Sequence, residues 1–412
     1  MKYFVLTADG AADRRLSACG GKSPMEAAAK PTMNMLSYRS FNGLVSNLPE
    51  GVAPAPYVVD LSVLGCDPSL CTGTLPFEAA GLGAAADGED TVFRCSLVSL
   101  SEGNGAYAGK TLTAANADDV TPEEAAKLIS ALNKGLSTKI KKFYNMSGTE
   151  HCLVWKRAPQ TGAVPAPTDI KGKKIGGSLP SGEAAARIVP MLEKSYAILK
   201  DHPVNVKRRS EGKKALNSIW LWNAVKRPDY ENFPDKWRVS CAAVSTDRMA
   251  AGIGAMLGMK PTVTADNAAT VAAVTAEFEA GTELVYVYAG AAAEAARKGD
   301  AAAKTAAIEA IDTEILAPVY EYLCGCGDQF KLLVSTGAPV LTETREYSAE
   351  PSPFFLYNST RTEVGYKPFS EQNAAKGGFC LPDGYKFVPF MIRLPAPAPE
   401  KEETPEDNGQ QQ

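Results

Sequence analysis

Short apolar runs alternate with helical patterns in the first and last parts of the chain. Four runs have the length and apolar character of buried strands, and they lie at 3–8, 239–244, 284–289 and 331–335. Helical patterns cover 247–257 and 301–323, and in the second of these branched apolar residues recur three or four positions apart. This alternation predicts an α/β fold with a doubly wound, mostly parallel sheet.

The middle of the chain has a different pattern. A helix is expected to begin at Thr121, because Pro122 takes the first helical position and an apolar stripe follows until Gly135. The stretches around this helix are rich in Gly, Ala, Pro, Asp and Thr. We therefore expect a smaller α/β domain, inserted into the main sheet domain.

These patterns predict the domain boundaries. The core comprises 1–78 and 236–393, and the inserted domain comprises 79–235. The segment 394–412 is rich in Pro and Glu and lacks apolar bulk, so it is expected to be disordered.

Composition narrows the class of protein. The 412 residues include 45% hydrophobic and 22% charged residues, as in ordinary soluble proteins of two or three domains. The net charge is -4 and no long Lys/Arg run is present, which argues against nucleic acid as a partner. No apolar run reaches the roughly 18 residues of a membrane span, and the first run is too short for a signal peptide. We expect a cytoplasmic protein with no membrane partner.

Cysteine and histidine counts limit the chemistry. The nine cysteines are odd in number and scattered, which favours free thiols over a disulfide framework. Only two histidines occur, His151 and His202, so no site can contain three imidazoles. The run at 20–23 ends like a phosphate-binding loop, but Leu16 stands where that motif requires Gly, and a loop leading into a helix is expected.

Asp9 and Ser62 are the first candidates for chemistry. Asp9 follows the first strand, at the edge where open α/β sheets bind ligands. Ser62 could act as a nucleophile only with help from a base or a metal ion.

Seven segments in order carry a specific resemblance. They begin at Leu6, Gly20, Leu61, Pro76, Asp201, Asn217 and Ala349. Through these segments the chain resembles the archaeal-type 2,3-bisphosphoglycerate-independent phosphoglycerate mutases of the alkaline phosphatase superfamily. The resemblance extends from residue 1 to about 393. The resemblance implies an alkaline-phosphatase-like core with a smaller insert. It also implies an isomerase that interconverts 3- and 2-phosphoglycerate in glycolysis through a phosphoserine, with two divalent metals of the Mn, Zn, Mg or Co type.

The resemblance gives roles to individual residues. Ser62 matches the catalytic nucleophile and Asp9 matches a metal ligand. Other ligand positions are substituted: an Asp position is Ala293, and two His positions are Arg297 and Tyr347. An Asp-His pair is expected after a later strand, but the stretch 335–339 there contains neither residue. Asp9 and Ser62 alone cannot hold two divalent ions, so we expect no metal cofactor and a pseudoenzyme that has lost metal binding.

The inserted domain keeps more of the family pattern. Its matching positions, which the resemblance marks as substrate-binding, are His151, Asp169, Arg208, Lys213 and Asn217. A small phosphorylated or carboxylated metabolite is therefore an expected partner.

Two other functions stay open at this point. The first is an active phosphoglycerate mutase or a related phosphotransferase whose metal site uses other ligands. Some relatives carry a homoserine kinase label, so the family name does not settle the substrate. Such a metal site would be rebuilt from carboxylates near the lost positions, namely Asp266, Glu294, Asp300 and Glu346. The second is a protein that binds partners or metabolites without catalysis.

Overall fold

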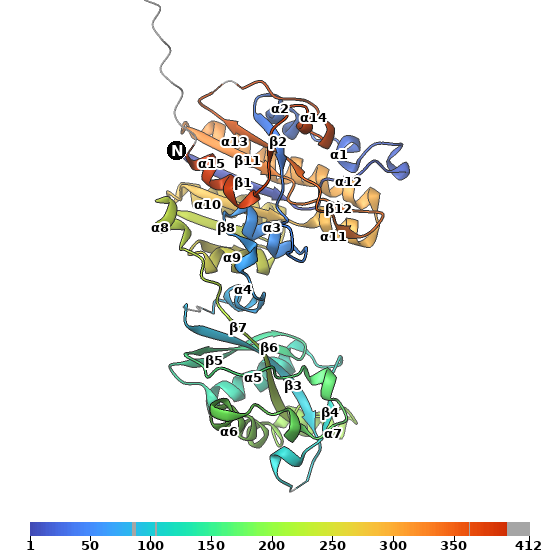
Figure 1. The fold of residues 1–412 in the computed structure, drawn as a ribbon, viewed down its shortest axis with the longest axis vertical. Helices are drawn as coiled ribbons and strands as arrows, with labels where there is room; N and C mark the ends of the chain where they lie inside the picture. The colour runs from blue at the N-terminus through green and yellow to red at the C-terminus, as the bar shows by residue number, and fades with distance from the viewer. Residues whose placement is uncertain (85–87, 104, 362, 394–412) are drawn as a thin grey trace, which may run out of the picture.

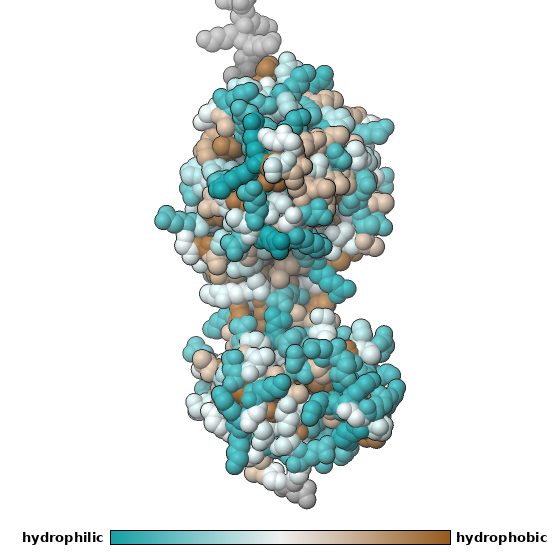
Figure 2. Space-filling model, turned by 90° about the vertical axis from the view of Figure 1, so that its right-hand side faces the viewer, coloured by the Kyte–Doolittle hydropathy of each residue, from teal (hydrophilic) through white to brown (hydrophobic). Residues whose placement is uncertain are grey.

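The computed structural model describes residues 1–84, 88–103, 105–361 and 363–393. Figure 1 shows two lobes: one holds the first and last parts of the chain, and the other holds the middle part. In the space-filling view of Figure 2 the lobes meet at a narrow waist. The expected tail, 394–412, lies outside the described residues.

The first lobe is built on a sheet of eight strands among the described residues. Its strands, in spatial order, are β15 (Cys380–Leu381), β2 (Phe41–Val45), β14 (Ser352–Asn358), β11 (Phe330–Ser335), β1 (Lys2–Ala8), β10 (Leu284–Ala289), β8 (Cys241–Ser245) and β9 (Lys260–Val263). All neighbouring pairs are parallel except the two that β14 makes. Side chains alternate between two hydrophobic cores, since Val5 faces one core and Phe4 and Leu6 face the other.

Helices cover both faces of this sheet. One face carries α3 (Pro56–Val63), α8 (Phe233–Trp237), α9 (Arg248–Met256) and α15 (Phe387–Arg393). The other carries α1 (Pro24–Ala27), α2 (Pro31–Tyr38), α10 (Asn267–Glu279), α12 (Ala301–Ala310) and α13 (Ala317–Gly325), with a π-helical turn at Ile311–Leu316. Beside them lie α11 (Ala291–Lys298), α14 (Glu371–Ala375), β12 (Val340–Leu341) and β13 (Glu346–Tyr347). This is the expected doubly wound, mostly parallel α/β architecture.

The second lobe contains a smaller antiparallel sheet. Its strands are β3 (Asp90–Leu100), β4 (Leu112–Ala114), β5 (Lys141–Ser147), β6 (Glu150–Lys156) and β7 (Ser218–Lys226), with β3 pairing to β4, β6 and β7. Three helices pack around it: α5 (Pro122–Leu136), α6 (Gly182–Leu199) and α7 (Pro203–Ser210). Helix α5 begins as expected, because Thr121 and Glu124 form a reciprocal capping box.

Helix α4 (Leu75–Ala80) joins the two lobes. Phe77 and Ala80 pack into the core of the first lobe, whereas Leu75 and Ala79 pack against Val92 and its neighbours in the second. The expected strands at 3–8, 284–289 and 331–335 are confirmed, and the one at 239–244 begins two residues later. The run at 20–23 is the expected loop, and Ser23 caps α1. Among the described residues, no helix has both the length and the apolar character to cross a membrane.

Candidate functional site

Asp9 lies at the carboxyl end of β1, in the middle of the large sheet. Its carboxylate is fully buried and accepts three hydrogen bonds: from the hydroxyl of Tyr347 (2.6 Å), the hydroxyl of Tyr288 (3.0 Å) and the amide of Ala338 (3.3 Å). Behind Tyr347, the Arg297 guanidinium donates to the Tyr347 hydroxyl at 2.9 Å and lies over its ring. The result is a continuous polar network of Arg297, Tyr347, Asp9 and Tyr288, which we call the Asp9 network.

The backbone around Asp9 is packed tightly. Gly10 adopts a φ of +70°, and a Cβ placed on it would lie 2.6 Å from the Cα of Ala293. Ala293 itself is fully buried, and its amide donates to the Asp9 carbonyl. Gly337, with a φ of +65°, approaches the Asp9 carboxylate from the other side. At Ala293 and Gly337, a small side chain and the backbone therefore lie directly against Asp9.

Burial and hydrogen bonding oppose each other at Asp9. Burial raises the pKa of Asp9 above its ordinary value, and the Tyr347 hydroxyl, the Ala338 amide, the Tyr288 hydroxyl and the charge of Arg297 lower it in part. Burial also raises the pKa of Tyr288 and of Tyr347, and the neighbouring Asp9 adds to this rise. Both phenols are therefore held as neutral donors to the carboxylate.

Ser62 lies in α3 and is fully buried. Its hydroxyl has no hydrogen-bond partner among the described residues. The chain at Gly384 covers it, since a Cβ on Gly384 would lie 2.7 Å from the Ser62 hydroxyl oxygen. No base therefore contacts Ser62 within the described part of the chain.

A second buried carboxylate, Asp60, was not foreseen. It accepts a short hydrogen bond from the hydroxyl of Tyr286, and burial raises its pKa well above the ordinary value. Tyr286 and Tyr288 are two residues apart on β10, so their side chains lie on the same face of the sheet. Two tyrosines in a strand that is otherwise apolar were the signal in the sequence.

A cavity of about 520 Å³ opens beside the Asp9 network. Tyr288 and Arg297 contribute to its wall, together with Arg248, Asp247 and Glu294. Arg248 begins α9 after β8, and Arg297 lies in α11 after β10, so both lining residues come from helices that follow neighbouring parallel strands. Asp247 caps α9 through a bond from the amide of Met249.

Carboxylates near the lost ligand positions do not gather around Asp9. Asp266 and Asp300 cap the helices α10 and α12, Glu346 is exposed on β13, and Glu294 lines the cavity. Across the described ranges, no group of three or more His, Cys, Asp or Glu residues is placed to hold a metal ion.

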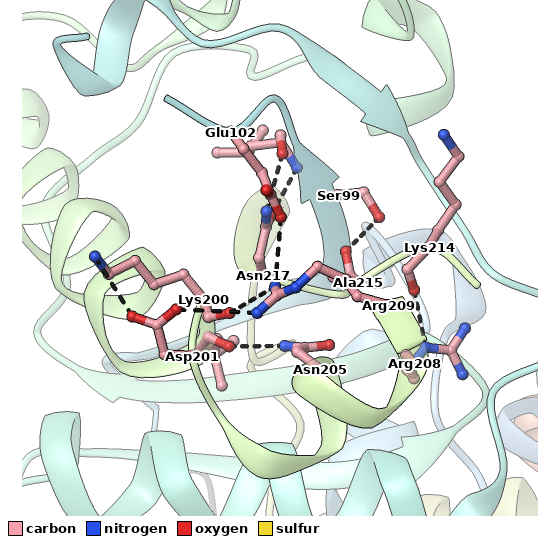
Figure 3. A network of polar contacts seen from close by, with 12 residues as sticks. Ser99, Glu102, Lys200, Asp201, Asn205, Arg208, Arg209, Lys214, Ala215 and Asn217 are labelled. Atoms are coloured by element: carbon pink, nitrogen blue, oxygen red, sulfur yellow. Dashed lines mark hydrogen bonds and ion pairs between the residues drawn. The ribbon is translucent and has the colours of Figure 1, made fainter. Parts of the chain in front are cut away.

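Two of the five candidates in the second lobe, Arg208 and Asn217, are buried and bonded to groups of the protein itself. The Arg208 guanidinium is fully buried and donates to Glu124, Asp119 and the carbonyl of Lys214, each at 2.8 Å. The Asn217 amide pairs with the backbone of Leu100 in both directions. Figure 3 shows Arg208 bonded to the Lys214 carbonyl, with Asn217 in the same group of polar contacts.

The remaining candidates lie apart from one another. The His151 ring is buried on β6, where Nδ1 accepts from the Met146 amide and Nε2 has no partner among the described residues. Burial lowers the pKa of His151 to about 4. Lys213 is exposed and pairs with Glu211 at 2.8 Å. Asp169 lines a separate cavity of about 500 Å³, together with Trp222 and Asn223.

Comparisons with known proteins agree with the architecture. Residues 38–205 match the family model described as 2,3-bisphosphoglycerate-independent phosphoglycerate mutase. The chain is 31% identical to a probable enzyme of that name from Geobacter sulfurreducens, over 95% of this chain and 100% of the relative. It is also 31% identical to the Methanosarcina barkeri enzyme of that name, again over 95% of this chain and 100% of the relative. Among solved structures, a cofactor-independent phosphoglycerate mutase from Thermoplasma acidophilum shares the fold, with a TM-score of 0.72, 22% identity and coverage of 96% of this chain and 100% of that chain.

Proposed function

Because the chain belongs to the 2,3-bisphosphoglycerate-independent phosphoglycerate mutase family, we propose that it is a catalytically degenerate member. In this proposal the protein keeps the family fold and does not interconvert 3- and 2-phosphoglycerate. The observation that carries the proposal is the Asp9 network, in which two tyrosine hydroxyls and a backbone amide donate hydrogen bonds to the Asp9 carboxylate.

The residues around Asp9 do not fit a divalent metal centre. Such a centre needs several carboxylate or imidazole ligands around each ion. Around Asp9, the neighbours at the substituted positions are a neutral phenol, a methyl group and a guanidinium, and a guanidinium repels a cation. The positive charge of Arg297, which donates a hydrogen bond to Tyr347, partly balances the negative charge of Asp9.

The surroundings of Ser62 support the same proposal. A serine attacks phosphorus only when a base or a metal takes its proton. The Ser62 hydroxyl is buried beneath Gly384 and has no activating partner in the described structure. The carboxylates that could rebuild a metal site cap helices or lie elsewhere, which argues against an active enzyme with other ligands.

Elemental analysis and a mutase assay test this proposal together. Purified protein would be analysed for bound metal and assayed for conversion of 3- to 2-phosphoglycerate with added Mn²⁺. The Methanosarcina barkeri relative serves as positive control and Ser62→Ala as background. We expect no stoichiometric metal and no turnover above the background. Stoichiometric metal, with turnover that Ser62→Ala abolishes, would overturn the proposal.

A role in binding metabolites is the second candidate, and one observation favours it. The cavity beside the Asp9 network presents two guanidinium groups, from Arg248 and Arg297, and guanidinium groups bind carboxylates and phosphates well. Titration calorimetry with 3-phosphoglycerate, on the wild type and on Arg248→Gln, tests this role. We expect the wild type to bind 3-phosphoglycerate and the substitution to weaken this binding about tenfold. Equal affinity in both proteins would exclude the cavity as the binding site.

A further inference from the structure

The second lobe carries an excess of positive charge. Residues 79–235 contain 22 Lys and Arg against 17 Asp and Glu, a net charge of +5. The rest of the chain contains 21 Lys and Arg against 30 Asp and Glu, a net charge of -9. A chain that is acidic as a whole therefore has one lobe that attracts anions.

A hollow between α5 and α7 gathers part of this charge. It has a volume of about 460 Å³, within the range of small-molecule sites, and we call it the α5–α7 cavity. The polar residues that line it are Lys127, Ser130 and Lys134 from α5, and His202 and Lys207 from α7 and its cap. Among the described residues, none that carries a carboxylate lines the cavity. It belongs to the lobe that does not contain Asp9.

Helical geometry fixes the spacing of the α5 lysines. Lys127, Ser130 and Lys134 follow one another three and four positions apart, so they share one face of the helix. A rise of 1.5 Å per residue separates the two lysines by about 10 Å along the axis. The opposite face is anchored in the core by Leu128 and Leu132, and the capping box at Thr121 holds the start of the helix. The two charges are thus presented on a rigid support.

The lysines are available for a ligand. Lys127 and Lys134 are exposed and form no ion pair among the described residues. Glu124, an acidic residue on the same helix, is already bound by the buried Arg208. Lys207 has only an exposed pair with Glu211, at 3.7 Å, and such pairs contribute little.

His202 adds a directed donor to the cavity. Its Nδ1 accepts from the amide of Val204 and caps α7, so the neutral ring carries its proton on Nε2. Partial burial and the charge of Lys127 both lower the pKa of His202, and the two residues line the same cavity. The cavity lining thus supplies three ammonium groups, an imidazole N–H and a hydroxyl, and the described residues add no acidic group to it.

We propose that the α5–α7 cavity binds a small molecule that carries two or more phosphate groups. Ammonium and N–H donors match phosphate oxygens, and the spacing of Lys127 and Lys134 suits two anionic groups better than one. This binding site is independent of Asp9 and of the cavity beside it.

Calorimetry with inorganic tripolyphosphate, at fixed and moderate ionic strength, tests this site. The cavity variant combines Lys127→Gln, Lys134→Gln and Lys207→Gln. Its matched control combines Lys139→Gln, Lys142→Gln and Lys194→Gln, which remove the same charge from exposed positions of the same lobe. We expect tripolyphosphate to bind about tenfold or more weakly to the cavity variant. The control variant should stay within about twofold of the wild type.

Two further measurements sharpen the test. Hydrogen exchange should show that tripolyphosphate protects amides in α5 and at the start of α7, and orthophosphate should bind more weakly than tripolyphosphate. Equal losses in the two variants would show attraction by net charge alone and overturn the site. Absence of binding to the wild type, or protection at other elements, would overturn it as well, and equal affinity for orthophosphate would overturn the requirement for two phosphates.

Discussion

Tyr347 stands where the resemblance places a histidine ligand, and its hydroxyl is the principal donor to Asp9. Removing that hydroxyl leaves a buried carboxylate with one partner fewer and leaves Arg297 without its acceptor. We expect Tyr347→Phe to lower the free energy of unfolding by about 1–3 kcal/mol at pH 7. The effect should shrink as the pH falls, because the Asp9 carboxyl then takes up a proton and needs the donor less.

Urea denaturation at pH 7 and pH 5 measures this effect. Tyr366→Phe is the control, since Tyr366 is exposed. Similar losses for the two substitutions, or a loss at Tyr347 that does not depend on pH, would mean that the hydroxyl does not serve the carboxylate.

His151 makes a second prediction at the scale of the residue. Its folded-state pKa is lowered to about 4, against an ordinary value near 6.5, so the unfolded chain binds the proton more readily. Stability should therefore fall as the pH drops from about 6.5 to about 4, by up to about 3 kcal/mol from this group. In His151→Asn, which keeps an acceptor for the Met146 amide, that part of the fall should vanish. The free energy of unfolding of both proteins would be measured across this pH range. Equal changes in the wild type and in His151→Asn would contradict the prediction.

At the scale of elements, Arg208 ties α7 to α5 and to the loop that precedes it. Its three bonds join Glu124, Asp119 and the Lys214 carbonyl, and its side chain is fully buried. We expect Arg208→Met to cost about 3 kcal/mol or more, because two carboxylates lose their buried partner. Lys213→Met, which changes an exposed charge, should cost less than about 0.5 kcal/mol. Chemical denaturation of both variants compares the two, and equal effects would argue against the structural role of Arg208.

The central strands could be predicted from the sequence, because each is a short apolar run with both faces buried. The strands β10 and β11 in particular match their runs in the sequence. The strands of the second lobe were not foreseen, since β5 and β7 mix buried and exposed positions and lie among loops rich in glycine and proline. Antiparallel strands with one solvent-exposed face give a weaker hydrophobic pattern in the sequence than buried parallel strands do.

The site was predicted only in part for a similar reason. Sequence order gives Asp9 its place at the end of a strand, but the contact with Tyr347 spans 338 positions of the chain. The resemblance identified Arg208 and Asn217 by position, yet it could not show that their side chains are engaged internally. Residue identity specifies the available chemistry, and tertiary packing decides whether that chemistry faces a ligand.

At the scale of the whole molecule, two sets of hydrophobic clusters lie on either side of one helix. The large sheet is packed between two cores, and the smaller sheet has its own core, with Leu153 buried on β6. Helix α4 contributes to both lobes, and an ion pair between Glu78 of α4 and Arg94 of β3 adds a polar link. The contacts of α4 favour a single cooperative unfolding transition, whereas separate hydrophobic cores favour a separate transition for each lobe.

Two matched cavity-forming substitutions distinguish these two outcomes. Leu153→Ala and Leu332→Ala each truncate a fully buried leucine in the middle of a strand, the first in the second lobe and the second on β11. Each should cost about 2–5 kcal/mol locally. If the lobes unfold separately, calorimetry should show two transitions, and each variant should lower the temperature of one only. We expect this outcome, because α4 is short and buries few side chains compared with either core. A single transition that both variants shift equally would show instead that α4 couples the whole chain.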